Sequence, residues 1–145
     1  MTLTRLARAV QTHKAIAHPV RLRMLLMLRE SPLCGCQIGA VVKLAASTIS
    51  EHLSELKKAG LVVEKKEGRW VEYSLVDDTA TETLLAAISP GFERDATVRA
   101  DAILVKALKR VPLEELCSVD LDLTQLERPA VATALERAER LLTER

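Results

Sequence analysis

Cys34 and Cys36 stand on either side of Gly35, and the chain has one further cysteine, Cys117. Thiolates are ligands for soft metal ions and metalloids. In a regular helix, residues two apart point about 200° away from each other, so two such sulfurs share one ion only if the turn distorts. Gly35 lowers the cost of that distortion, because glycine tolerates unusual backbone dihedrals. The spacing therefore predicts a thiol pair that acts as a trigger.

The number of thiols limits the kind of ion that the chain could bind. Trivalent arsenic and antimony favour three thiolates in a pyramid, whereas zinc and cadmium favour four ligands in a tetrahedron. Cys34, Cys36 and Cys117 match the first number. A four-ligand site would need a histidine, a carboxylate or a partner subunit in addition. Water or a thiol from solution could also take the third position, since simple packing suits Cys117 about as well as ligation does.

Three other interpretations of the cysteines stay open. Cys34 and Cys36 could be two small buried hydrophobic residues, or oxidant sensors that form a disulfide or a sulfenic acid. Cysteines this close in sequence form strained bridges, which disfavours the disulfide. A thiol enzyme would use one of them as its nucleophile, but no neighbouring motif supplies a base and an oxyanion site. We therefore predict a protein that is not an enzyme and has no catalytic residues.

Helices and one hairpin must position these cysteines. Apolar periodicity with helix-starting and helix-stopping residues predicts the helices, and alternation around a polar turn predicts the hairpin. The predicted helices lie at residues 3–17, 19–29, 36–44, 46–59, 79–88, 93–110 and 129–142. The predicted hairpin has strands at 61–64 and 70–75 and a turn at 65–69. Residues 111–128 show no regular pattern.

A helix pair followed by a hairpin is the plan of a winged helix-turn-helix. The predicted fold class is mainly α with a β-hairpin wing. Residues 1–90 are predicted to form the winged domain, and residues 91–145 a helical C-terminal extension packed on the same domain. With 145 residues, 48% of them hydrophobic, the chain has enough apolar material for one compact core.

The predicted helix at 46–59 is the candidate DNA-reading helix. Its Ile49, Leu53 and Leu56 fall on one face and are predicted to be buried. The opposite, polar side and the tip of the hairpin suit contacts with a DNA groove and with phosphates. The predicted DNA-contacting residues are Ser47, Thr48, Ser50, Glu51, Ser54, Lys57, Lys58 and Arg69. The alternatives are an ordinary amphipathic surface helix and, for Arg69, a solvated turn residue.

Charge is distributed unevenly along the chain. Residues 1–76 carry 12 Lys and Arg against 6 Glu and no Asp, whereas residues 77–145 carry 9 basic against 14 acidic residues. The basic half favours a polyanionic partner such as nucleic acid. No stretch approaches the roughly 20 apolar residues of a membrane span, and the start lacks the apolar segment of a signal peptide. We therefore predict a cytoplasmic protein with no membrane partner.

Five segments, taken together and in order, resemble the ArsR/SmtB family. They run from Ala17 to Arg23, Leu33 to Cys36, Ser47 to Leu53, Ala59 to Val62 and Gly68 to Leu75. The resemblance covers roughly residues 3–88. It implies a homodimeric winged-helix repressor that binds double-stranded operator DNA near its own promoter and leaves it when a metal or metalloid binds. It also implies a dimer interface at residues 3–17 and 79–88.

The resemblance implies that Cys34 and Cys36 are both ligands, as in the arsenic- and cadmium-type members. The chain differs from that signature at Gly35, where a bulky apolar residue is usual, and at Gln37, where an acidic one is. Some arsenic sensors have a third cysteine three residues after the pair, and this chain has Gly39 there. The family's other sensing site, built from Asp and His after the wing, is not supported, because no histidine follows His52.

These patterns together predict a DNA-binding transcriptional repressor that leaves its operator when As(III) binds to cysteine thiolates. Sb(III) and Cd(II) are alternative inducers, and no organic cofactor is predicted. Binding is expected to unwind the first turn of the helix at 36–44 and so to tilt the DNA-reading helix. A redox-responsive regulator that uses the same cysteines is the main alternative. A module for protein association is a weaker one.

Overall fold

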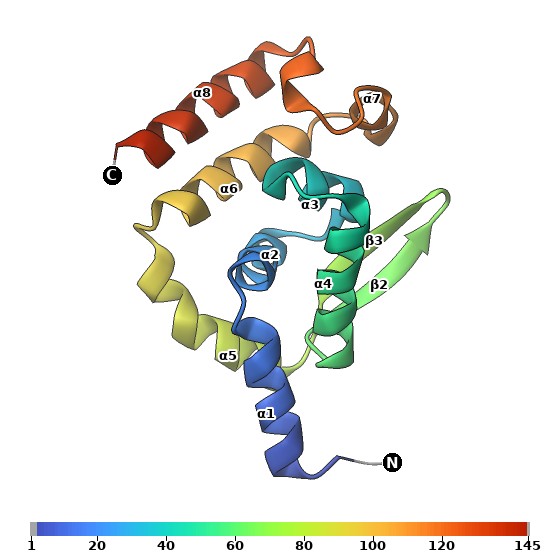
Figure 1. Cartoon of the computed structure of the whole chain (residues 1–145), viewed down its shortest axis with the longest axis vertical. Helices are drawn as coiled ribbons and strands as arrows, with labels where there is room; N and C mark the ends of the chain where they lie inside the picture. The colour runs from blue at the N-terminus through green and yellow to red at the C-terminus, as the bar shows by residue number, and fades with distance from the viewer. Residues whose placement is uncertain (1–2, 145) are drawn as a thin grey trace.

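The computed structural model describes residues 3–144. Residues 1 and 2 of the predicted winged domain and residue 145 of the predicted C-terminal extension lie outside the described residues. Helices dominate the fold, and three short strands form one sheet (Figure 1). The elements in order are α1 Arg5–Ile16, α2 Pro19–Glu30, β1 Leu33–Cys34, α3 Gly35–Val42, α4 Ala46–Lys58, β2 Val62–Glu67, β3 Trp70–Leu75, α5 Thr79–Ile88, η1 Ser89–Phe92, α6 Ala96–Leu108, α7 Leu113–Ser118, η2 Leu123–Gln125 and α8 Pro129–Thr143. Within residues 3–144, none of the helices combines the length and apolarity of a membrane span.

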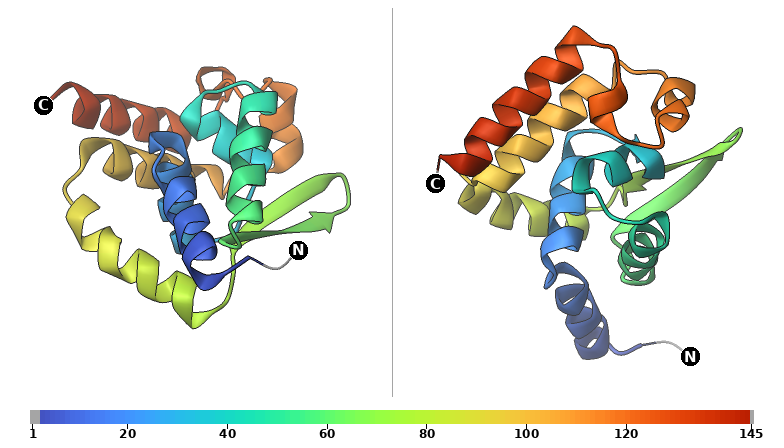
Figure 2. Two further views of the ribbon diagram at one scale, coloured as in Figure 1. Left: turned by 60° about the horizontal axis from the view of Figure 1, so that its bottom comes forward. Right: turned by 45° about the horizontal axis from the view of Figure 1, so that its top comes forward.

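The winged helix-turn-helix prediction is confirmed. Helices α3 and α4 are joined by a short turn that begins at Lys43, whose left-handed backbone (φ 57°) ends α3. Strands β2 and β3 form the wing, which projects from the helical body in both views of Figure 2. The wing turn is tighter than the predicted 65–69, because β2 continues to Glu67 and Gly68 turns the chain with a positive φ of 59°.

A third strand, β1, is the main departure from the predicted elements. Leu33 and Cys34 pair antiparallel with β3, opposite Tyr73 and Glu72 respectively, so the strand order is β1-β3-β2. Cys34 has an extended backbone (φ −76°, ψ 153°) and precedes the first residue of α3. The expectation that helical geometry forces both thiols apart is therefore wrong for Cys34, which lies outside the helix.

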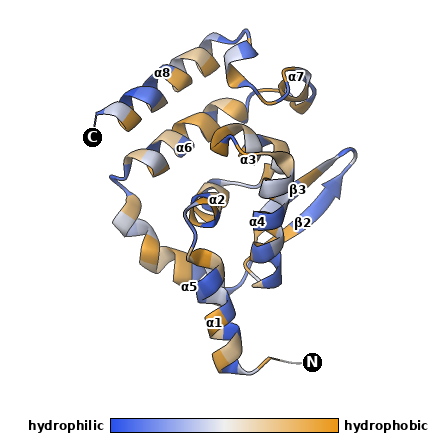
Figure 3. Ribbon diagram, in the orientation of Figure 1, coloured by the Kyte–Doolittle hydropathy of each residue, from blue (hydrophilic) through white to orange (hydrophobic). Residues whose placement is uncertain are grey.

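The core lies between α2, α3, α4 and the sheet. Met24, Leu25, Leu33 and Ile38 are almost fully buried at its centre. On α4, the three residues predicted to face inward are buried, as predicted: Ile49, Leu53 and Leu56. In Figure 3 the outward side of α4 and the outer part of β2 are polar, so the two elements present one hydrophilic surface.

The C-terminal extension folds back onto the winged part. Helix α6 packs against α2 and α3, and α8 runs antiparallel beside α6 (Figures 1 and 2). The facing sides are apolar, with Leu104 and Leu108 of α6 and Val131 and Ala134 of α8 all buried. The predicted helices at 93–110 and 129–142 are confirmed with slightly different ends, and the unassigned stretch contains α7 and η2. A domain boundary near residue 90 stays a prediction.

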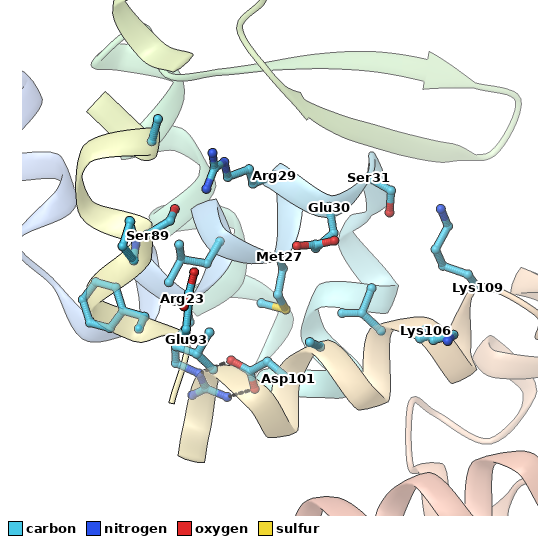
Figure 4. A pocket seen from close by; sticks show the side chains of 17 residues that line it. Arg23, Met27, Arg29, Glu30, Ser31, Ser89, Glu93, Asp101, Lys106 and Lys109 are labelled. Carbon is cyan, nitrogen blue, oxygen red and sulfur yellow. Dashed lines mark hydrogen bonds and ion pairs between the residues drawn. The ribbon is translucent and has the colours of Figure 1, made fainter. Parts of the chain in front are cut away.

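A buried ion pair ties α2 to α6. Arg23 donates from Nε to Asp101 Oδ2 at 2.8 Å and from Nη2 to Asp101 Oδ1 at 2.9 Å. Burial raises the pKa of Asp101, although the Arg23 guanidinium acts in the opposite direction. The pair lines a cavity of about 670 Å³ between α2, η1 and α6 (Figure 4). This cavity lies away from the cysteines, so it is not the candidate thiol site.

Candidate functional site

Cys34 lies where the sheet meets α3. It is 7% exposed, and its backbone N–H donates to Gln37 Oε1 at 2.8 Å. Gln37 thus caps the start of α3, which gives a structural role to the amide at a position where the family signature has an acid. The backbone φ of Gly35 is not positive, so the fold does not require the conformational freedom of glycine at this position. Burial, followed by the Glu72 and Glu67 carboxylates, raises the pKa of Cys34.

Cys36 and Cys117 lie beside each other although 80 positions separate them. Cys36 is the second residue of α3 and is half-buried, whereas Cys117 is exposed near the end of α7. Burial raises the pKa of Cys36 to about 11, with further contributions from the charges of Cys117 and Cys34 and from a side-chain hydrogen bond with Cys117. The structure therefore places Cys117 of α7 beside Cys36 of α3, with Cys34 of β1 two residues before Cys36.

The loop after α7 holds Cys117 against α3. Leu121 covers Gly39, since a Cβ placed on Gly39 would lie 3.5 Å from Leu121 Cδ1. Asp120 and Leu121 both have positive φ values, 50° and 62°. Such left-handed conformations are costly for a branched residue such as leucine and persist only where surrounding contacts impose them. Leu116, which is fully buried in α7, supplies one such contact by accepting the Leu121 N–H at 3.2 Å.

The chemistry of this donor set fits As(III), which takes three soft sulfur ligands. Within residues 3–144, no three Cys, His, Asp or Glu side chains are already arranged around one point as metal ligands. The three thiols are therefore neighbours and not a preformed ligand cage. Each of them belongs to a different element, so closing the site moves those elements relative to one another.

Alkylation of Cys36 should show its raised pKa. The thiolate is the reactive species, so a pKa of about 11 in place of 9.0 leaves about one thiol in a thousand ionised at pH 8. We expect the iodoacetamide rate at Cys36, followed by peptide mass spectrometry, to rise about tenfold per pH unit until close to pH 11. In denaturant, the same cysteine should level off about two pH units lower. Identical profiles in the folded and denatured states would contradict this assignment.

The predicted DNA-contacting residues lie on α4 and in the wing turn. On α4, Ser47, Ser50, Glu51, Lys57 and Lys58 are exposed, and Thr48 and Ser54 are half-buried. Both lysines of this set form ion pairs: Lys57 Nζ lies 2.6 Å from Glu64 Oε1 on β2, and Lys58 Nζ lies 3.6 Å from Glu55 Oε1. Arg69 is exposed in the wing turn, with its guanidinium 4.9 Å from the centre of the Trp70 ring. Their contacts with DNA stay predictions.

Residues that position α4 were missed by sequence reasoning. Arg21 donates to the carbonyl of Ala15 at the end of α1 (2.6 Å), and its Nη1 lies 3.4 Å from His52 Nδ1 on α4. The His18 and His52 rings also lie against each other, with centroids 4.4 Å apart and planes tilted by 46°. Burial, together with His18 and Arg21, lowers the pKa of His52, which favours the neutral ring. No local pattern reveals this cluster, because it joins α1, α2 and α4.

Comparison with known proteins agrees with this architecture. Residues 18–64 match the family described as "Bacterial regulatory protein, arsR family". The chain is 42% identical over 78 residues to an uncharacterized HTH-type transcriptional regulator of Methanocaldococcus jannaschii, a match that covers 53% of this chain and 88% of the relative. It is 40% identical over 63 residues to the arsenic resistance transcriptional regulator ArsR1 of Pseudomonas putida, covering 43% of this chain and 49% of that protein. The chain thus spans about half the length of this second relative.

Among solved structures, HlyU from Vibrio cholerae is similar to this chain. The two share 30% sequence identity with a TM-score of 0.57. The match covers 98% of HlyU but only 63% of this chain. More than a third of this chain therefore has no counterpart in HlyU.

Proposed function

The chain belongs to the ArsR family of bacterial regulatory proteins, and from that premise we propose a homodimeric repressor that leaves its operator when As(III) binds Cys34, Cys36 and Cys117. The observation that carries the proposal is the position of Cys34 and Cys36 at the start of α3, the first helix of the helix-turn-helix, with Cys117 of α7 beside Cys36. The relatives reported above are named as transcriptional regulators, which agrees with the prediction that the chain is not an enzyme.

The protonation state of the thiols suits condensation with arsenite. Three thiols and As(OH)₃ give a trithiolate and three waters, with no change of oxidation state and no net release of protons. A thiol with a pKa of about 11, such as Cys36, carries its own proton to the departing hydroxide. The same value argues against the redox alternative, because cysteines that sense oxidants are low-pKa thiolates. Sb(III) would react in the same way.

The packing of α3 connects ion binding at the thiols to the position of the DNA-reading helix α4. Gly39 lies between the extension and α4, since a Cβ on it would be 3.5 Å from Leu121 Cδ1 and 3.9 Å from Ile49 Cγ1. Drawing Cys36 and Cys117 toward Cys34 therefore shifts the α3 surface on which α4 rests. This replaces the expected unwinding of a helix that contains both cysteines. A coupling of about 1 to 3 kcal/mol would lower operator affinity about 5- to 150-fold.

Exposed apolar residues on α1 and just before it support the homodimer. Leu3, Leu6 and Val10 are 47%, 77% and 45% exposed, which is unusual for large apolar side chains so close together. Leu6 and Val10 belong to α1, which projects from the body (Figure 1), and Leu3 precedes that helix. Burying them against a second copy would place two α4 helices in one particle, as binding to successive major grooves about 34 to 36 Å apart requires.

Arg69 should contribute to operator affinity through phosphate or minor-groove contacts. We expect Arg69→Ala to weaken binding to all DNA sequences and to reduce the slope of log affinity against log salt by about 1. Fluorescence anisotropy over a range of salt concentrations measures both quantities. Arg99→Ala, an exposed arginine on α6, is the matched control and should leave the slope unchanged. An unchanged slope for the Arg69 variant would exclude it from the interface.

The proposed function is tested by a gel shift of the reduced protein on the DNA upstream of its own gene. We expect a specific complex that dissociates when arsenite is added. Failure to bind this DNA, or a complex that persists at saturating arsenite, would overturn the proposal.

A further inference from the structure

The cavity between α2, η1 and α6 has the size and the lining of a site for an organic molecule. Its volume of about 670 Å³ lies within the roughly 300 to 1,000 Å³ that small-molecule pockets occupy. Apolar side chains form its body, among them Leu26 and Met27 of α2, Phe92 of η1, and Val98 and Val105 of α6. An apolar space of this size suits a molecule with an apolar body and not a bare ion.

The two ends of the cavity differ in charge. The Arg23–Asp101 ion pair lies at one end together with Glu93, and Ser31 and Lys109 lie at the other (Figure 4). Ser31 and Lys109 each follow a member of the ion pair by eight residues, so the ends lie about 12 Å apart along the helices. Because Arg23 and Asp101 neutralise each other, Glu93 gives the first end a negative charge.

The second end is positively charged. Lys106 and Lys109 line it and form none of the ion pairs found within residues 3–144. Arg29 also lines the cavity, but its guanidinium lies 3.6 Å from Glu82 Oε1. Glu30 adds a single carboxylate at this end, so the two lysines leave an excess of positive charge that attracts an anion.

Ser31 adds an unpaired hydroxyl to the same end. Its Oγ is buried and has no hydrogen-bond partner within residues 3–144. A buried hydroxyl without a partner is destabilising, and native structures keep few of them. Ser31 belongs to the cavity wall, so rotation about its Cα–Cβ bond can turn Oγ toward the cavity. There the hydroxyl can donate to an anionic head group.

We propose that this cavity binds an amphipathic organic anion, in the simplest case a carboxylate with an apolar tail. The head group lies at the end formed by Ser31, Lys106 and Lys109, and the tail extends past Met27 toward Phe92. The reverse orientation is disfavoured, because it places the anion beside Glu93. The ligand contacts α2 of the winged part and α6 of the C-terminal extension at once. This inference does not rest on the thiol site.

Titration calorimetry with octanoate tests the proposal on the reduced protein. Octylamine has a tail of the same length with the opposite charge, and acetate has the head group alone. We expect saturable binding of one octanoate per chain and at least tenfold weaker binding of the other two probes. Absence of saturable octanoate binding, or equal affinity for octylamine, would overturn the inference. The titrations contain neither arsenite nor DNA, so their failure leaves the proposed function standing.

A double lysine variant locates the head group. We expect Lys106→Gln with Lys109→Gln to lower octanoate affinity about tenfold, because each charge pair at a partly exposed site contributes up to a few-fold. Arg99→Gln with Arg110→Gln is the matched control, since it removes two exposed positive charges of the same region that do not line the cavity. Its affinity should stay at the wild-type level. Equal losses in the two double variants would overturn the assignment of the head group.

A tryptophan placed in the cavity tests where the tail binds. Ala102 is an exposed lining residue of α6, so Ala102→Trp fills the cavity without entering the core. We expect this variant to lose octanoate binding. Ala132→Trp, at an exposed position of α8 that does not line the cavity, should bind as the wild type does. Circular dichroism checks that both variants are folded, and wild-type affinity in folded Ala102→Trp would overturn the inference.

Discussion

Replacing Cys36 by serine is expected to abolish the release of operator DNA by arsenite. Cys36 lies beside Cys117 and two residues after Cys34 in the sequence, so its loss removes the thiol that neighbours both others. In the wild type, saturating arsenite should lower operator affinity about 5- to 150-fold. In Cys36→Ser the ratio of affinities with and without arsenite should be close to one. Fluorescence anisotropy on labelled operator DNA measures both affinities.

Two controls accompany the Cys36 variant. Serine is nearly the same size as cysteine, so operator affinity without arsenite should match that of the wild type and show that α4 is still in place. Cys117→Ser removes the ligand contributed by the extension and should retain only a reduced response. A full response to arsenite in Cys36→Ser would show that the thiol site is not the sensor. A full response in Cys117→Ser alone would reduce the site to the two thiols of β1 and α3.

Removing the carboxylate of Asp101 is expected to have the largest effect on stability. The Asp101 side chain is only 6% exposed and accepts two hydrogen bonds from Arg23. Asp101→Ala leaves the guanidinium without its partner between α2 and α6 (Figure 4). Breaking a buried pair in this way costs about 3 to 5 kcal/mol. Urea denaturation followed by circular dichroism measures the loss in free energy of unfolding.

The pair between Arg128 and Glu115 is the matched control for Asp101. It has the same two-pronged geometry, with bonds of 2.8 and 2.7 Å, but both side chains are more than a third exposed. Exposed ion pairs contribute little, because water screens them. Glu115→Ala should therefore destabilise the protein much less than Asp101→Ala. Equal effects would show that burial does not determine what the Arg23 pair contributes.

Local sequence patterns were sufficient to predict the elements that carry the proposed DNA-reading surface. The inward face of α4 follows from the spacing of Ile49, Leu53 and Leu56, and these residues are buried. Asp78 caps α5 as expected, accepting the Thr81 N–H at 2.7 Å. Such features depend on residues within one or two turns of each other, so the sequence contains all the information they need.

The thiol site could be predicted only in part. The sequence identifies the three cysteines, but β1 has two residues and exists only through pairing with β3, about 40 positions later. The position of Cys117 depends on the return of α7 to α3, which requires two consecutive left-handed residues, Asp120 and Leu121. No periodicity marks such residues. The register that sets Glu72 opposite Cys34 is equally a property of the assembled sheet.

The central claim is that the thiol site and the DNA surface are coupled, and coupling between two binding sites is reciprocal. The most direct test is the arsenite affinity of the free protein against that of the operator complex, followed by arsenic–thiolate absorption. We predict that arsenite binds the operator complex more weakly, by the same factor of about 5 to 150 by which it weakens operator binding. Equal arsenite affinities in the two states would contradict the account.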